Sequence, residues 1–245
     1  MSGLNLISRE AEVLKTLRAI HQMREKFTLV GGYAVNAYST LPRYSVDCDI
    51  VVANPQLEKF LSFFKSRDYT EKGTIYRNEI EGIATRKLVK GPGEEQVSVD
   101  LLVDGVRCRQ TGAVWKEEEV SKTSKELRVT SVNGSALSSV ASRELLIAMK
   151  LHSGRDTDLR DVVMLTRDAN WERVRELCHR GSTEKLISQL RRDVETLGER
   201  QFEDQLKSAF ASKQNESQRI GRALMEVSKL LNELQKRKSG VHHKR

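Results

Sequence analysis

Apolar and polar positions change from a mixed pattern to a purely helical one near residue 140. Residues 5–26 carry apolar side chains about every 3.6 residues with charged residues between them, which predicts an amphipathic helix. The stretch FTLV (27–30) predicts a short buried strand that stops at Gly31-Gly32. The next stretch, YAVNAYSTL, predicts a helix that ends before Pro42, because proline disfavours helix at the preceding residue.

Period-two patterning predicts strands over much of the region that follows. The stretch SVDCDIVVA (45–53) predicts a strand with Asp47 and Asp49 on one face and Cys48 on the other. Further strand-like stretches are TIYRN, IATRKLV, QVSVDLLVD and LRVTSV, separated by glycine-rich or polar segments. Between them, residues 55–68 predict a helix, and the acidic stretch 116–126 predicts a surface loop.

After Asn133-Gly134 the pattern predicts helices to the end of the chain. The helical runs cover roughly 143–153, 157–168, 171–180, 184–211 and 216–238. The last run has an apolar stripe of about two heptads, which favours packing against the preceding helix. We therefore predict an α+β fold with a mixed sheet flanked by helices in residues 1–140, followed by an α-helical C-terminal domain in residues 141–245.

Composition fits a soluble globular protein with 38% hydrophobic and 31% charged residues. No apolar run is long enough for a membrane span, and the first residues do not resemble a signal peptide. The three cysteines, Cys48, Cys108 and Cys178, are far apart and lack CxxC spacing, which argues against a disulfide framework and structural zinc. We expect a cytoplasmic protein with no membrane partner.

The net charge of +8 is uneven along the chain. Residues 1–140 hold 20 basic and 18 acidic side chains, whereas residues 141–245 hold 22 and 16. A basic half is typical of proteins that bind a polyanion such as RNA. It is equally typical of the solvated faces of a charged helical domain, so the charge alone leaves both interpretations open.

Paired acids within a strand carry the strongest chemical signal. Asp47 and Asp49 are two residues apart and lie on the same face of the predicted strand. Two carboxylates in this arrangement can bind a divalent cation. Mg²⁺ is the expected ion, because it prefers oxygen ligands and is often completed by substrate phosphates. Asp100 lies in another apolar strand, VSVDLLV, and predicts a third carboxylate at the same place. A lysine or arginine that filled the space between these acids would argue against the site.

The glycine pair upstream of the acids suits a phosphate. Gly31 and Gly32 can adopt positive φ and let a ligand approach the backbone. The helix predicted after them would point its first N–H groups at the same spot. Gly-Gly alone is weak evidence because most such pairs are turns, so the prediction depends on the ordered set of glycines and acids.

This ordered set resembles the signature of the nucleotidyltransferase superfamily typified by DNA polymerase beta. The resemblance rests on the stretches VGG, VDCDIVV and, later, VSVDLLV. The spacer between VGG and VDCDIVV is slightly longer than usual. The block SRELLIAMKLHSGRDTDLRDVVML (142–165) is similar to one found in AbiEii-type and related minimal nucleotidyltransferases of toxin–antitoxin and abortive-infection systems. The resemblance covers about residues 28–165 and implies a nucleotidyltransferase-like sheet.

The resemblance also implies roles for individual residues. Asp47, Asp49 and Asp100 would be catalytic and would ligate two Mg²⁺ ions. The nucleotide-binding residues would be Gly31, Gly32, Arg43, Lys150, Asp158 and Asp161. The residues themselves leave alternatives: Lys150 can be an ordinary helix lysine, Asp158 and Asp161 can simply hold Lys150 and Arg155, and Arg43 can pair with a neighbouring acid.

The implied activity is transfer of a nucleoside monophosphate from an NTP, such as ATP, to a hydroxyl. The acceptor could be an RNA or tRNA 3′ end, a protein or a small molecule. The AbiEii-like block implies a toxin–antitoxin component with a cognate antitoxin. Two other interpretations remain: a non-catalytic nucleotide- or RNA-binding module on the same fold, and a scaffold that binds a partner through helices 184–238.

Overall fold

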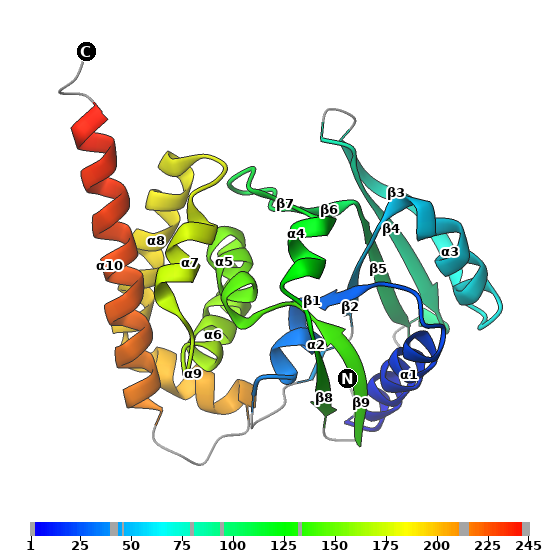
Figure 1. Ribbon diagram of the computed structural model, residues 1–245. Helices are drawn as coiled ribbons and strands as arrows, with labels where there is room; N and C mark the ends of the chain where they lie inside the picture. Colours follow the sequence, from blue (N-terminus) through cyan, green and yellow to red (C-terminus); the bar gives the residue numbers. More distant parts are fainter. Residues whose placement is uncertain are drawn as a thin grey trace. The chain divides into compact units, whose positions relative to one another are not determined.

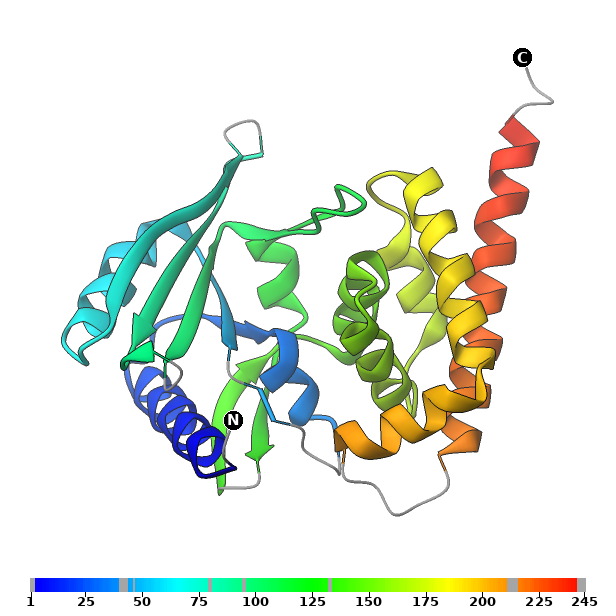
Figure 2. The ribbon, with the colours of Figure 1, turned by 180° about the vertical axis from the view of Figure 1, so that it is seen from behind.

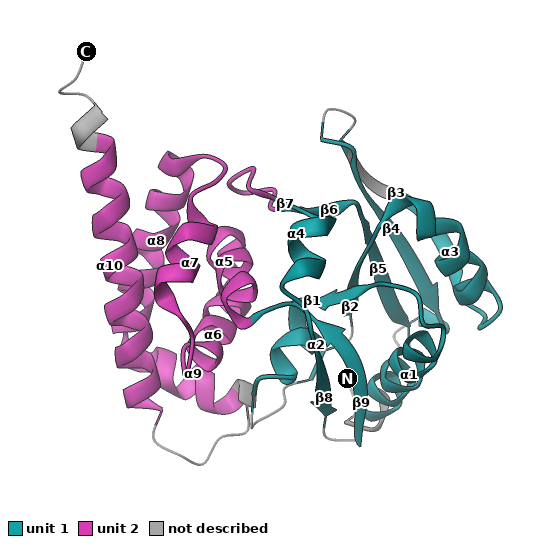
Figure 3. Cartoon of the chain, viewed as in Figure 1, with its two compact units in different colours: residues 1–107, 115–142 teal, residues 108–114, 143–245 magenta. Residues whose placement is uncertain are grey.

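The computed structural model describes residues 3–39, 44–45, 47–78, 81–93, 96–131, 134–210 and 216–241. These residues form the predicted combination of a mixed sheet with helices and a helical second part (Figure 1). Contacts divide the chain into two compact units, coloured in Figure 3: unit 1 is residues 1–107 and 115–142, and unit 2 is residues 108–114 and 143–245. No local sequence pattern predicts that residues 108–114 belong to the helical unit.

Unit 1 is built on one seven-stranded sheet with the order β3-β4-β5-β2-β1-β9-β8. The strands are β1 (Thr28–Val30), β2 (Asp47–Val52), β3 (Thr70–Asn78), β4 (Ile83–Lys90), β5 (Val97–Val103), β8 (Lys125–Ser131) and β9 (Gly134–Val140). β2 pairs in parallel with β5 and antiparallel with β1, and β1 runs parallel to β9. Two short strands, β6 (Gly105–Arg107) and β7 (Val114–Lys116), pair with each other.

The helices of unit 1 are α1 (Gly3–Gln22), α2 (Gly31–Asn36), α3 (Leu57–Lys65) and α4 (Glu117–Lys122), with the 3-10 turn η1 (Asn54–Gln56) before α3. Helix α1 packs against β5 and β9, as the apolar stripe of its sequence requires. Phe27, just before β1, makes an edge-to-face contact with Phe60 of α3, with ring centroids 6.4 Å apart. Figure 2 shows α1 and α3 beside the strands from behind.

Unit 2 contains the helices α5 (Arg143–Ser153), α6 (Asp156–Leu165), α7 (Trp171–Cys178), α8 (Thr183–Gly198), α9 (Arg200–Phe210) and α10 (Ser217–Val241). α10 packs against α8 and α6, which accounts for its apolar stripe, and α5 packs against α6 and α7. His152 of α5 anchors the segment 108–114: its Nδ1 lies 2.7 Å from the Thr111 hydroxyl, and its carbonyl accepts from Cys108 Sγ at 2.8 Å. In the described part of the chain, no helix combines the length and apolarity needed to cross a bilayer.

Two predictions of local structure are wrong within unit 1. The predicted loop 116–126 contains helix α4, because glutamates in its first turn and Lys122 in its last turn complement the helix dipole, and Val120 is buried. The predicted helical region after Gly134 begins instead with strand β9. Its inward positions hold small residues such as Ala136 and Ser138, while Leu137 is exposed, so apolar patterning does not reveal the strand.

A third prediction is wrong within unit 2. The single helix predicted over 184–211 is two helices, α8 and α9. Gly198 ends α8, and Glu199 adopts an extended conformation with ψ 135°. Glycine has low helix propensity, so the position of Gly198 explains why the helix predicted over 184–211 is interrupted there.

Candidate functional site

Strands β2 and β5 bring two of the predicted acids side by side. Asp49 and Asp100 are register partners in the parallel pairing of these strands. Strands in a sheet lie about 4.8 Å apart, and directly paired residues project on the same face. Both aspartates are half-buried, whereas Cys48 and Ile50, which alternate with Asp49 along β2, are fully buried. The acids therefore lie on the more open face of this part of the sheet.

Gly31 lies directly against the carboxylate of Asp49. It follows β1, whose last residue, Val30, is the register partner of Asp49. Its φ is +67°, and a Cβ added to it would lie 2.0 Å from Asp49 Oδ2. The positive φ favours glycine, and the close approach of Asp49 leaves no room for a Cβ. Gly31 and Gly32 form the first turn of α2 rather than a loop before it, so the helix starts earlier than predicted.

Cys48 reports on the shared electrostatic environment of the acids. Burial raises the pKa of its thiol, and the nearby carboxylates of Asp49, Asp100 and Asp47 raise it further. All three carboxylates therefore raise the pKa of one thiol, that of Cys48 on β2. Cys48 remains a neutral, buried thiol, on the face of β2 opposite Asp47 and Asp49 as the alternation predicts.

Asp47 lies on the same face but at the exposed end of β2. Its carboxylate accepts a hydrogen bond from the hydroxyl of Ser98, its register partner on β5. Within the described residues, no group of three or more His, Cys, Asp or Glu side chains is gathered closely enough to hold a metal ion. The three predicted acids therefore share a region and a face but do not form a closed cage in this conformation.

Lys87 is a basic residue beside these acids that sequence reasoning did not identify. It is the register partner of Asp100 on β4, and its Nζ lies 3.7 Å from Asp100 Oδ1. Since the strand order is β4-β5-β2, Lys87 flanks Asp100 on the side away from Asp49. Its backbone therefore lies outside the pair of acids, while its ammonium forms an ion pair with one of them.

The residues fit a divalent cation of the magnesium type. Carboxylate oxygens are the ligands that Mg²⁺ prefers, and Asp49 and Asp100 present them from adjacent strands. The close approach of Gly31 leaves no space for a side chain at position 31 on that flank of Asp49. Asp49 and Asp100 would hold the ion, and Asp47 would contribute only after its carboxylate leaves Ser98.

The predicted residues of the second block form an ion cluster inside unit 2. Lys150 Nζ lies 2.6 Å from Asp158 Oδ1 and 2.8 Å from Asp161 Oδ2. All three side chains are buried, and both aspartates are fully inaccessible. Asp158 also accepts from Arg155 Nε at 2.6 Å. The cluster joins α5 to the start of α6, which favours the alternative that the aspartates hold Lys150 and Arg155.

The charges in this cluster stabilise one another. Burial alone would lower the pKa of Lys150, but the carboxylates of Asp161 and Asp158 outweigh it and raise that pKa. Burial would likewise raise the pKa of Asp158, yet Lys150 and Arg155 lower it to about 2. In α8, burial raises the pKa of Asp193 to about 7, with Asp158 and Asp156 adding to the effect and Arg192 opposing it.

Several predicted contacts are not tested by the structure. Arg43 lies outside the described residues. Contact with a nucleotide stays a prediction for the other residues: Gly31, Gly32, Lys150, Asp158 and Asp161. The residues that sequence reasoning missed, Lys87 and Ser98, have no motif of their own. Only the register of β4 and β2 against β5 identifies them.

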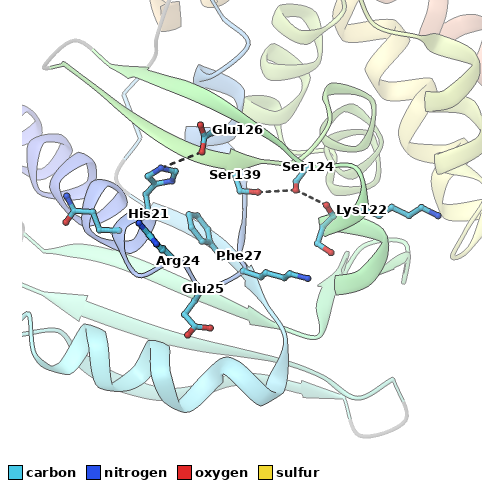
Figure 4. Close-up of a pocket in the computed structure, with 11 residues that line it drawn as sticks. His21, Arg24, Glu25, Phe27, Lys122, Ser124, Glu126 and Ser139 are labelled. Atoms are coloured by element: carbon cyan, nitrogen blue, oxygen red, sulfur yellow. Dashed lines mark hydrogen bonds and ion pairs between the residues drawn. The ribbon is translucent and has the colours of Figure 1, made fainter.

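Unit 1 also contains a cavity of about 820 Å³ away from these acids. Its lining includes Phe27, next to the first residue of β1, whereas Gly31 follows the last residue of this strand. None of the predicted site residues lines the cavity. Figure 4 shows its polar groups: His21 pairs with Glu126 at 3.5 Å, and the hydroxyls of Ser124 and Ser139 are 3.0 Å apart. Charges of both signs line the cavity, so it does not select one class of ligand.

Comparisons with known proteins give limited similarity. No family model and no curated protein matches the chain. Among solved structures, JHP933 from Helicobacter pylori is 13% identical, with a TM-score of 0.48 over 99% of this chain and 98% of that one. A candidate nucleotidyltransferase from H. pylori is 14% identical, with a TM-score of 0.45 over 96% and 98% of the two chains. Identities and TM-scores this low do not indicate a function.

Proposed function

We propose that the protein is a magnesium-dependent nucleotidyltransferase that moves a nucleoside monophosphate from an NTP to a hydroxyl acceptor. The observation that carries the proposal is the pairing of Asp49 with Asp100 across β2 and β5, with Gly31 closely packed against Asp49. Two carboxylates on one open face repel each other, and Lys87 brings one positive charge to Asp100. A phosphate-rich substrate would bring a divalent metal whose charge lowers this repulsion further.

The roles of the residues follow from their positions. Asp49 and Asp100 would ligate the metal, and Asp47 would complete the set when a ligand draws it away from Ser98. Asp100, the register partner of Asp49, would also help to deprotonate the attacking hydroxyl. Bound magnesium would lower the pKa of the acceptor hydroxyl and neutralise charge on the departing pyrophosphate. Gly31 would let the backbone at the start of α2 come close to a phosphate.

Unit 2 would contribute mainly through its buried ion cluster and its charge. Lys150 already contacts two carboxylates, so we assign it chiefly to positioning α5 and α6, and its predicted contact with the triphosphate remains part of the proposal. The basic excess of residues 141–245 supports an RNA or tRNA acceptor over a protein or small molecule. A toxin–antitoxin role with a cognate antitoxin, and a cytoplasmic location, belong to the same proposal.

The experiment that tests the proposal is label transfer. The protein is incubated with each α-³²P-labelled NTP, Mg²⁺ and either total RNA or RNA-free lysate, and labelled macromolecules are separated by gel electrophoresis. We expect label on one acceptor class with the wild type, and none with Asp49→Asn or Asp100→Asn. Asp68→Asn is the matched control, since Asp68 is exposed and at φ 64°, a conformation that asparagine tolerates.

The second candidate is a nucleotide- or RNA-binding module without catalysis. The open arrangement of the acids, with Asp47 bonded to Ser98 and Asp100 paired with Lys87, favours it. The module predicts equal binding of nucleotide or RNA by the wild type and Asp49→Asn, and no label transfer by either. Transfer that depends on Asp49 excludes it.

A further inference from the structure

Lys87, Asp100 and Asp49 form one row across three adjacent strands. Lys87 is the register partner of Asp100 in the β4–β5 pairing, and Asp49 is the register partner of Asp100 in the β5–β2 pairing. The three side chains therefore project on the same face of the sheet. Such a row puts one basic side chain next to the pair of acids proposed to bind a metal.

The contact between Lys87 and Asp100 is a loose one. The distance of 3.7 Å from Nζ to Oδ1 qualifies as an ion pair but exceeds a normal hydrogen-bond length. The Lys87 side chain is 34% exposed and that of Asp100 is 20% exposed. A pair at this distance gains less than a charge-assisted hydrogen bond, and a lysine ammonium on a flexible stem can be re-aimed.

We infer that Lys87 is an exchangeable counter-ion of this site. Without metal, its ammonium neutralises Asp100; when a divalent cation binds Asp49 and Asp100, it leaves Asp100 and binds a phosphate of the substrate or product. This inference rests on the proposed function. It assigns Lys87 two opposite effects, because the lysine opposes binding of the metal alone and favours binding of the metal with a phosphate ligand.

The physical basis is competition between cations. A carboxylate that already faces an ammonium gives up that interaction when it ligates a metal, so removal of the ammonium strengthens metal binding. Once the metal neutralises the acids, the ammonium next to them attracts anions. Lys87 then lies beside the place where pyrophosphate, with its high charge, would be held.

The test uses Mn²⁺ and inorganic pyrophosphate as probes, since pyrophosphate binding does not depend on the base of the NTP. Binding of Mn²⁺ alone is measured from the free Mn²⁺ signal in electron paramagnetic resonance, and binding of pyrophosphate in the presence of Mn²⁺ is measured by equilibrium dialysis of ³²P-labelled pyrophosphate. For Lys87→Gln we expect roughly two- to fivefold tighter binding of Mn²⁺ alone. We expect roughly five- to tenfold weaker binding of pyrophosphate in the presence of Mn²⁺.

Two variants control the test. Lys72→Gln removes the same charge from an exposed position on β3 of the same sheet and should change neither affinity. Lys87→Arg keeps the positive charge and should keep Mn²⁺ binding near the wild-type value. Urea unfolding of each variant checks that the fold is intact, and Lys87→Gln should unfold at nearly the wild-type urea concentration.

The outcomes separate this inference from the proposed function. Unchanged or weaker Mn²⁺ binding by Lys87→Gln, or unchanged pyrophosphate binding, overturns the counter-ion role. If the wild type binds no Mn²⁺, or if Asp49→Asn binds it equally well, the proposed function itself fails.

Discussion

Substitution of Gly31 by alanine tests whether Asp49 is held by the close approach of the backbone. The added Cβ would lie 2.0 Å from Asp49 Oδ2, 2.9 Å from its Cγ and 3.2 Å from its Cβ. The outer atoms of the carboxylate can rotate away, but the last contact involves an atom fixed to the backbone of β2. Asp49 must therefore change its rotamer, and β2 must shift slightly.

The expected loss of stability has two parts. Alanine at φ +67° costs about 1–2 kcal/mol, because Cβ meets the backbone in the left-handed region. Overpacking against Asp49 adds about 1–3 kcal/mol. Gly82→Ala separates the two parts, since Gly82 has the same φ of +67° and nothing within 4 Å of its added Cβ. We expect Gly82→Ala to lose the first part only.

Urea unfolding followed by circular dichroism gives the free energies, and Mn²⁺ binding reports on the site. Gly31→Ala should be the less stable variant by about 1–3 kcal/mol and should bind Mn²⁺ weakly, whereas Gly82→Ala should bind it normally. Adding Asp49→Ala to Gly31→Ala should recover part of the stability. Equal stability of the two glycine variants, with Mn²⁺ binding retained by Gly31→Ala, would show that the close approach of Gly31 does not hold Asp49.

Two further predictions concern the buried charges of unit 2. Lys150→Met leaves Asp158 and Asp161 buried without their shared cation, so the free energy of unfolding should fall by about 3–5 kcal/mol. Arg155→Ala, whose side chain is 66% exposed, should lose less than about 1 kcal/mol; similar losses in urea unfolding would contradict the assignment. Asp193 holds its proton in the folded state up to its raised pKa of about 7, against an ordinary value of 3.8, so stability should fall as pH rises through that window. Asp193→Asn should flatten this slope and stabilise the protein at pH 8; an unchanged pH profile of urea unfolding would show that Asp193 does not titrate there.

Much of the candidate site follows from local sequence. The two-residue spacing of Asp47 and Asp49 is enough to place them on one face of β2, because side chains in a strand alternate. The burial of Cys48 between them follows from the same alternation. Alternation and helical periodicity are properties of neighbouring residues, so they can be read without knowing what an element packs against.

Local pattern fails where the environment of an element comes from distant parts of the chain. Strand β9 exposes Leu137 and buries Ser138, since its inward face is set by pairing with β1 and β8 and by α1. Helix α4 is likewise stabilised by burial of Val120 in an otherwise polar stretch. Neither burial is evident from the order of apolar residues.

The order of residues is enough to predict that two acids share one face of a strand and that a third lies in another apolar strand. Which of these residues meet depends on the assembled sheet. A shift of one residue in the β2–β5 register would turn Asp100 to the opposite face from Asp49, and the β4–β5 register alone brings Lys87 to Asp100. Register depends on hydrogen bonds between strands far apart in sequence and on the packing of the whole sheet. For that reason, the pairing of Asp49, Asp100 and Lys87 is a property of the fold and of no local segment.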